Sequence, residues 1–143
     1  MAELQADPEW VRMNAEDDAR YAAEVAKLQA ELAPEHAPLL RDLAAVGLRV
    51  RSVSELVNMS APYPKAIPVL LAHLAKARHP VLRDMLARSL TVEEAEGIAG
   101  GPILHELKRE QDSETRWAMA NALTIVAGPA DKAEIAAMVK DPH

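Results

Sequence analysis

The sequence contains no cysteine and no phenylalanine, and its only aromatic residues are two tryptophans and two tyrosines. The absence of cysteine excludes disulfides, thiol nucleophiles and thiolate metal sites, and it suits a reducing compartment. No apolar run approaches the roughly 20 residues of a membrane-spanning helix, and the amino terminus lacks the basic and then apolar layout of a signal peptide. These absences predict a soluble, cytoplasmic protein without a membrane partner.

The core must therefore be built almost without aromatic rings. Half of the residues are apolar, so alanine, leucine, valine, isoleucine and methionine have to fill it. Alanine and leucine are the strongest helix formers, and a chain of 143 residues is long enough to bury a core without metals or disulfides. We expect a single all-α domain over residues 1–143.

The net charge of −6 is concentrated at the amino terminus, where residues 1–47 hold ten acidic side chains against four basic ones. This acidity is typical of a solvated helix face, and the alternative is a docking surface for a basic partner. A surface that follows phosphates needs a basic excess, and base stacking needs aromatic rings. We therefore expect no nucleic-acid partner.

Residues 1–47 are predicted to form two acidic helices. Pro8 suits a first helical position, where its missing N–H costs nothing. Pro34 is expected to end the first helix, because the residue before a proline is pushed out of the helical region, and Gly47 is expected to stop the second. The apolar stripe of the first helix consists of Tyr21, Val25, Leu28 and Leu32.

Residues 48–63 are predicted to be a connector and a short helix. The stretch "LRVRSV" alternates like a strand, but an isolated strand has nowhere to pair its backbone, so we interpret it as extended. Ser52 and Glu55 have the spacing of a capping box that opens the short helix. The following "SAPYP" breaks the chain.

Residues 66–91 return in altered form 33 positions later, as residues 99–124. Each copy predicts a helix, a tight turn and a second helix, with Pro80 at a first helical position and Asp112 or Ser113 as a cap. Because one such hairpin buries only one face, the units are expected to stack and share a core. The identical pairs are Ala66 and Ala99, Leu71 and Leu104, Leu74 and Leu107, Arg83 and Arg116, Ala87 and Ala120, Leu90 and Leu123, and Thr91 and Thr124.

A last helix is predicted in residues 129–143, where it would cap the stack. Its apolar side leaves surface that a second copy or another partner could cover, so a homodimer through this helix is one hypothesis. The apolar residues are Ala133, Ile135, Ala136, Met138 and Val139.

The repeated part resembles HEAT repeats, especially the short HEAT-like units associated with phycobilin lyases. The resemblance covers residues 64–126 and implies a short right-handed α-solenoid of HEAT/armadillo-like stacked hairpins, with two repeats in residues 64–128. It also implies that Asp112, Arg116 and Arg83 bond between neighbouring units, while His79 stands where the first copy should carry its Asp. The residues that carry the likeness are Pro68, Leu71, Leu74, Asp112, Ser113, Arg116, Ala120 and Leu123.

No motif indicates a reaction. The five histidines lack ligand spacing and are expected on helix surfaces or in caps, and the "GIAGGP" turn lacks the lysine of a phosphate-binding loop. Thr91 and Glu94 are interpreted as a capping box rather than as part of a paired-carboxylate site. We therefore expect no catalytic residue, no cofactor and no metal site.

The favoured function is a non-enzymatic scaffold that binds a protein or peptide on the inner face of the stack, which the second helices line. One alternative is a nucleic-acid-binding or DNA-glycosylase-like protein, since some HEAT-like folds are alkylpurine DNA glycosylases. A lyase-type role is the other alternative, and it rests on family analogy alone.

The repeat alignment singles out Trp117, which falls opposite Asp84, and Asn121, which falls opposite Arg88. Because Asp84 and Arg88 are on the polar stripe of their helix, Trp117 is expected to face outward. It either packs on a neighbouring helix or under the amino-terminal arm, or it anchors a partner site. Exposed tryptophan and arginine often dominate binding interfaces. The residues proposed to surround it are Arg83, Asp84, Arg88 and Asn121.

Overall fold

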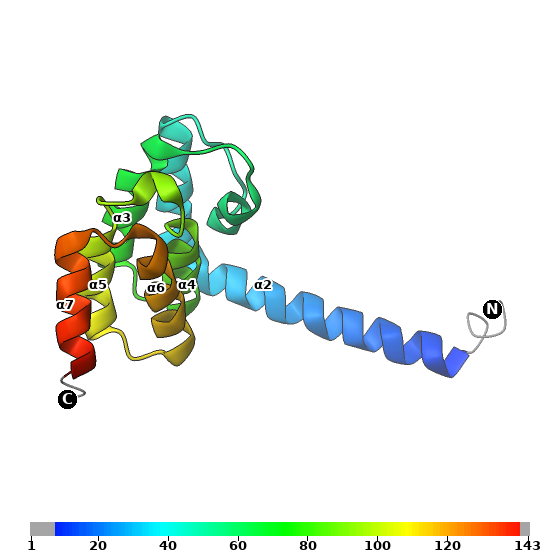
Figure 1. The fold of residues 1–143 in the computed structure, drawn as a ribbon. Coiled ribbons are helices and arrows are strands. Elements are labelled where there is room, and N and C mark those ends of the chain that lie inside the picture. The colour runs from blue at the N-terminus through cyan, green and yellow to red at the C-terminus, as the bar shows by residue number, and fades with distance from the viewer. Residues whose placement is uncertain (1–7, 141–143) are drawn as a thin grey trace. The chain divides into compact units, whose positions relative to one another are not determined.

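A computed structural model describes the backbone of residues 8–140 and the side chains of residues 15–137. The regular secondary structure of this part of the chain is all helical, with no strand (Figure 1), which confirms the all-α prediction. No helix within residues 8–140 is both long and apolar enough to span a membrane. The elements are α2 (Pro8–Ala45), η1 (Val53–Asn58), η2 (Pro64–Ala66), α3 (Ile67–Lys76), α4 (Pro80–Ser89), η3 (Glu93–Ala95), α5 (Gly100–Arg109), α6 (Ser113–Val126) and α7 (Pro129–Lys140), where η marks a 3-10 helix.

The prediction of two amino-terminal helices is wrong, because α2 is one helix of 38 residues that continues through Pro34. A proline inside a helix removes one backbone hydrogen bond. Residues rich in alanine, leucine and glutamate continue the helix on both sides, and beyond the proline Leu39 and Leu43 are fully buried. Helix propensity and burial therefore outweigh the bond that Pro34 cannot make.

The chain divides into two compact units, Met1–Pro34 and Glu35–His143. In the first unit, the described residues form a single helix whose apolar stripe starts at Tyr21, which is 70% exposed. Val25 and Leu28 on the same stripe are half-buried. Arg20 pairs with Asp17 at 3.3 Å across one helical turn.

The carboxyl end of α2 has the stop that the sequence predicts. Gly47 has a φ of 93°, its N–H donates to the Ala44 carbonyl at 3.0 Å, and the N–H of Leu48 donates to the Leu43 carbonyl at 2.9 Å. These two bonds form a Schellman motif, which requires a left-handed residue after the helix. Gly47 therefore ends α2 and turns the chain into the connector.

Gly47→Ala should lower the free energy of unfolding by about 1 kcal/mol, because a side chain in the left-handed region is strained even where nothing obstructs it. No atom lies within 4 Å of the added carbon, so the effect isolates the backbone strain. Gly101→Ala is the matched control, since Gly101 lies inside α5 and its added carbon meets only ordinary contact. Urea unfolding should show that this control is neutral or stabilised, and equal effects of both substitutions would contradict the prediction.

In the second unit, the helices pack as hairpins. α3 packs against α4, and α5 packs against α6 (Figure 1). The first helices contact one another in the order α3, α5, α7, the second helices α4 and α6 contact each other, and η1 packs on α4. The core between them includes Leu70, Leu74, Leu82, Leu86, Leu90, Ile103, Leu104 and Met119, all fully buried.

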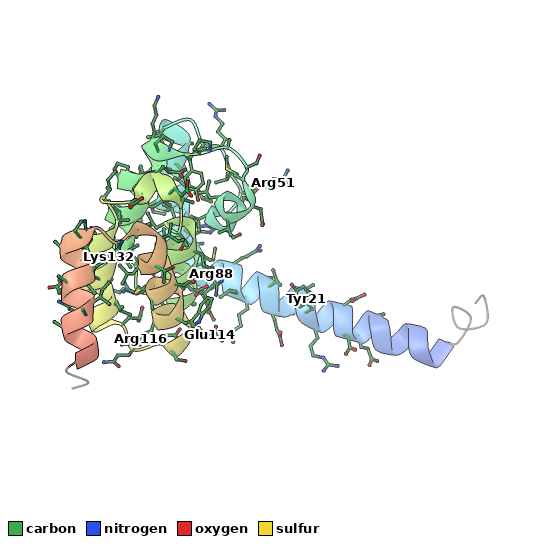
Figure 2. All side chains as sticks on the ribbon, viewed as in Figure 1. Tyr21, Arg51, Arg88, Glu114, Arg116 and Lys132 are labelled. Atoms are coloured by element: carbon green, nitrogen blue, oxygen red, sulfur yellow. The ribbon has the colours of Figure 1, made fainter. Side chains whose placement is uncertain are left out.

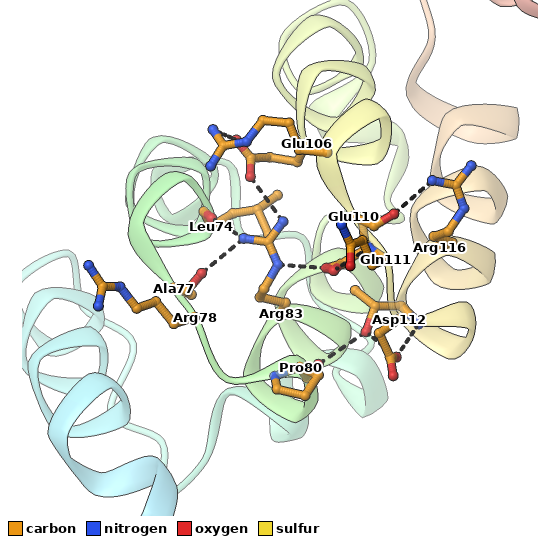
Figure 3. Close-up of polar contacts among 12 residues, drawn as sticks. Leu74, Ala77, Arg78, Pro80, Arg83, Glu106, Glu110, Gln111, Asp112 and Arg116 are labelled. Atoms are coloured by element: carbon orange, nitrogen blue, oxygen red, sulfur yellow. Dashed lines mark hydrogen bonds and ion pairs between the residues drawn. The ribbon is translucent and has the colours of Figure 1, made fainter. Parts of the chain in front are cut away.

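The two arginines of the 33-residue repeat make equivalent hydrogen bonds; Figure 3 shows both bonds of Arg83 and the bond of Arg116 to Glu110. Nη1 of Arg83 donates to the carbonyls of Leu74 at 3.2 Å and Ala77 at 2.9 Å. Nη1 of Arg116 donates to the carbonyls of Leu107 at 2.9 Å and Glu110 at 2.8 Å. Each arginine thus satisfies carbonyls at the end of the preceding helix, which have no partner within that helix.

Arg83 differs from Arg116 because it also bridges to the next hairpin (Figure 3). Its Nε donates to Glu110 at 2.6 Å and its Nη2 donates to Glu106 at 2.9 Å. Burial by itself lowers the pKa of the guanidinium, but the two carboxylates outweigh this effect and raise the pKa above its ordinary value. The placement of Arg83 on an exposed surface is wrong, since only 8% of the residue is exposed.

The inter-hairpin role that the resemblance implies for Asp112 is taken by Thr115. Asp112 caps α6, where its carboxylate accepts from the N–H of Thr115 at 3.0 Å and from its hydroxyl at 2.8 Å. The backbone bond from Thr115 is the main reason that the pKa of Asp112 is lowered. The Thr115 hydroxyl also lies 3.2 Å from the carbonyl of Pro80 on the neighbouring hairpin. His79 caps α4 by accepting from the N–H of Val81 at 3.2 Å.

Candidate partner-binding groove

An open groove of about 500 Å³ lies on the second unit. It combines three stretches that are distant in sequence: η1 with the segment that follows it, the end of α4 with the loop into η3, and α6. The lining residues, which define the groove from here on, are 56–57, 59–63, Arg88, 91–94, Asn121 and Ile125.

Local capping chemistry builds the η1 side of the groove. Ser52 and Glu55 form the capping box that the sequence predicts, with the Ser52 side chain accepting from the backbone and Glu55 accepting from the Ser52 N–H at 3.0 Å. Met59 follows η1 with an extended backbone. Two prolines at positions 62 and 64 then favour extended geometry in the residues before them.

Tyr63 fixes this segment to the rest of the groove. Its hydroxyl donates to the Ser89 carbonyl at 2.7 Å, and its backbone N–H donates to Oε2 of Glu94 at 2.8 Å. The predicted Thr91–Glu94 capping box is therefore wrong, because Glu94 binds a distant backbone group and the Thr91 hydroxyl donates to the Ala87 carbonyl at 2.9 Å. Burial, followed by the charge of Glu94, raises the pKa of the Tyr63 phenol to about 12.

Wild-type protein should lose stability as the pH rises from about 10 towards 12, and Tyr63→Phe should lose less over the same range. The folded state holds the phenol neutral, with its pKa raised to about 12, whereas an unfolded tyrosine ionises near pH 10. The stabilisation is therefore complete below pH 10 and is lost as the pH approaches the folded value. Urea unfolding at pH 8 and at pH 11 checks this prediction, and parallel losses in both proteins would contradict it.

Trp117, Asn121 and Ile125 follow one another at intervals of four residues on α6, so they share one face of that helix. Trp117 is 60% exposed and Ile125 is also exposed, while Asn121 and Ile125 line the groove. The outward orientation predicted for Trp117 is confirmed. The face of α6 that lines the groove therefore also carries a large exposed ring, one turn before Asn121.

Arg88 connects the groove to that ring. It projects from α4 (Figure 2), and its Cζ lies 5.6 Å from the centre of the Trp117 ring, within the range of a cation–π contact. Its Nε donates to Oδ2 of Asp84 at 2.8 Å, one turn earlier on the same helix. Oδ1 of Asp84 is buried and has no hydrogen-bond partner among the described residues.

The structure therefore assembles four of the five residues singled out in the sequence. Trp117, Arg88 and Asp84 are linked by the contacts above, and Asn121 lies one turn further along α6. Arg83 does not belong to this surface, because its guanidinium points into the packing between the hairpins (Figure 3). Asp84 and Arg88, like Trp117 and Asn121, are four residues apart, and residues at this spacing are neighbours on the surface of a helix.

The unpaired charge of the groove is negative. Its one cationic lining side chain, Arg88, is already paired with Asp84. Glu93 is exposed and makes no ion pair or side-chain hydrogen bond with another described residue. Glu94 accepts one hydrogen bond among the described residues, from the Tyr63 N–H to its Oε2. A ligand in the groove would thus meet apolar side chains and a free carboxylate.

His36 and His73 make structural contacts between segments that are distant in sequence, whereas His143 lies outside the described residues. Nε2 of His36 accepts from the N–H of Val53 at 3.1 Å, and burial lowers the pKa of His36. His73 is buried rather than on a surface, and its Nε2 lies 2.7 Å from Oδ2 of Asp42. This bond is the main reason that the pKa of Asp42 is lowered. Within the side chains that the structure describes, no three His, Asp or Glu residues form a group that could hold a metal ion.

Sequence reasoning missed the residues that η1 and its following segment contribute. The available signal was Tyr63, an aromatic residue between two prolines in a chain with few aromatics. Its partners Ser89 and Glu94 lie 26 and 31 residues further on. No local pattern connects positions so far apart, so only the folded chain reveals the groove.

Comparison of the chain with protein-family models, with curated proteins and with solved structures finds no match. The likeness of residues 64–126 to HEAT repeats stays a resemblance in sequence pattern. Function must therefore be inferred from the groove and its surroundings.

Proposed function

We propose that this protein is a non-enzymatic interaction module that binds a protein or peptide at the groove and the adjoining Trp117 surface. The observation that carries the proposal is the exposed Trp117 ring, with Arg88 above it, beside an open groove. Binding interfaces concentrate their energy in aromatic and arginine side chains. A groove of this size lies within the range of binding sites and presents apolar side chains with a few polar groups.

The same proposal includes a short right-handed solenoid of HEAT-like hairpins as the scaffold. Two observations support it: the first helices contact in the order α3, α5, α7, and Arg83 and Arg116 repeat the same carbonyl bonds. In such a stack each unit contacts only its neighbours, and the second helices present a continuous face. The groove uses that face, because Arg88 belongs to α4 and Asn121 belongs to α6.

The charges of the groove favour a protein partner over a nucleic acid. A phosphate backbone needs several free cationic side chains, and the single arginine here is paired with Asp84. The free Glu93 carboxylate would repel phosphate. The chain as a whole carries a net charge of −6, which opposes binding to a polyanion.

A pull-down with the purified chain, followed by identification of the retained proteins, tests the proposal. The comparison is between wild type and Trp117→Ala combined with Asn121→Ala, two exposed positions whose truncation leaves the core intact. A partner retained by wild type and lost by the variant, while circular dichroism shows equal helix content, supports the groove. Equal retention by both proteins would place the binding surface elsewhere.

We also propose self-association through α7, as a separate hypothesis. α7 packs on α5, and Lys108 pairs with Glu134 at 3.0 Å. Ala133 and Ala136 are exposed and Ile135 is half-buried, so α7 presents apolar surface, while Met138 and Val139 lie outside the described side chains. Light scattering over a concentration series should show mass rising towards a dimer, and Ile135→Glu should reduce it. A monomer at every concentration would refute the hypothesis.

A further inference from the structure

We propose that the groove selects an extended polypeptide segment in which a lysine or arginine stands next to an aliphatic residue, and that Glu93 determines this preference. The proposal rests on the proposed function, because it assigns a ligand class to the same groove. Three independent properties of the lining residues lead to it: their free charge, their exposed apolar side chains and their unused backbone groups.

The unpaired carboxylate in the groove favours a cationic ligand group. Glu93 is exposed and unpaired among the described residues, whereas Arg88 is paired with Asp84 at 2.8 Å. Glu94 adds a second carboxylate that Tyr63 holds in place through its backbone N–H. An incoming acidic group would meet like charge, which costs affinity, while an ammonium or guanidinium group would meet opposite charge.

The apolar side chains suit the long stem of such a cation. Val57, Met59 and Ile125 are exposed and all line the groove. Lysine and arginine bury their methylene stems along apolar surface while the charged end stays near water or a carboxylate. The remaining apolar surface can accept a neighbouring aliphatic side chain, and methionine adapts its shape to such contacts.

The unused hydrogen-bonding groups match a peptide backbone. The N–H groups of Ser60 and Ala61 make no hydrogen bond within the described chain. The side-chain amide of Asn121 is also unpaired there, and it offers both donors and an acceptor. A helix satisfies its own backbone, whereas an extended chain brings free N–H and C=O groups that can pair with these. An extended segment with a basic residue can therefore contact the carboxylate, the apolar side chains and the unpaired hydrogen-bonding groups of the groove.

A random heptapeptide library displayed on phage tests this proposal, with the full chain immobilised as bait. Peptides retained by wild type should be enriched in lysine or arginine adjacent to valine, isoleucine, leucine or methionine. Glu93→Lys should abolish the basic preference. Glu96→Lys is the matched control, because Glu96 is exposed in the same turn and carries the same charge change outside the groove lining.

A synthetic peptide with the enriched sequence then gives the affinities. Glu93→Lys should weaken its binding by roughly tenfold or more, which corresponds to about 1.4 kcal/mol, while Glu96→Lys should change it by less than about twofold. Retained peptides without basic enrichment, or a preference that survives Glu93→Lys, would overturn the assignment and leave peptide binding intact. Failure of wild type to retain any peptide above an empty surface would count against both the assignment and the proposed function.

Discussion

Arg83→Ala should lower the free energy of unfolding by about 3 to 5 kcal/mol, because it leaves the Glu110 carboxylate without a cation among the described residues and leaves Glu106 only the exposed Arg109, 3.7 Å away. The side chains of Glu106 and Glu110 are only 5% and 11% exposed, and both accept bonds from the Arg83 guanidinium. Their desolvation is offset by that guanidinium in the native protein. The carbonyls of Leu74 and Ala77 also lose their donor. Urea unfolding monitored by circular dichroism measures the difference.

Arg116→Ala is the matched control for this prediction. Arg116 makes the equivalent two carbonyl bonds one repeat later, but it is exposed and forms no ion pair with another described residue. Its loss should cost less, about 1 to 3 kcal/mol, the net contribution of two ordinary hydrogen bonds. If both substitutions cost the same, the carboxylates do not depend on Arg83 and the account of the network is wrong.

A triple substitution separates the loss of the ion network from the loss of side-chain volume. Arg83→Met combined with Glu106→Leu and Glu110→Leu replaces all three charges with apolar groups of similar size. Replacement of a complete buried ion network in this way is often neutral or stabilising. The triple variant should therefore recover most of the stability that Arg83→Ala loses. A triple variant as unstable as Arg83→Ala would indicate that packing, not charge, governs this position.

The sequence predicted the features that neighbouring residues determine. The stop at Gly47 and the box of Ser52 with Glu55 were both confirmed, because each depends on bonds that span five residues or fewer. The continuity of α2 through Pro34 was missed, since propensity and burial on both sides outweighed a local signal. Local chemistry therefore predicted element ends where no distant contact competed with it.

The repeat alignment predicted part of the site because it transferred information between hairpins. It singled out Trp117, Arg88 and Asp84, and in the structure the Arg88 guanidinium lies 5.6 Å from the centre of the Trp117 ring and bonds to Asp84. It could not show that Arg83 turns inward, because the carboxylates that hold it lie 23 and 27 residues away. From sequence, a charged residue on a helix is expected to be exposed. This expectation changes only when the facing helix is known to carry the opposite charge.

Trp117→Ala should weaken partner binding by about 2 kcal/mol or more, roughly 30-fold, because the substitution removes the large exposed ring next to the groove. Its effect on folding should be small. The ring is 60% exposed, and the contact with Arg88 at 5.6 Å contributes only about 0.5 to 1 kcal/mol at an exposed position. Titration calorimetry with the enriched peptide measures the first effect, and urea unfolding measures the second.

Trp117→Phe is the control that distinguishes the contribution of an aromatic ring at this position from the contribution of the other residues of the site. It keeps an aromatic face for Arg88 and for a ligand stem, so it should retain more of the affinity than Trp117→Ala. Asp84 and its bond to Arg88 are untouched in both variants. A loss of about 3 to 5 kcal/mol in folding stability would show that Trp117 is a core residue in solution. A stable Trp117→Ala protein that binds the peptide at full strength would confine the site to the groove and exclude the ring as its anchor.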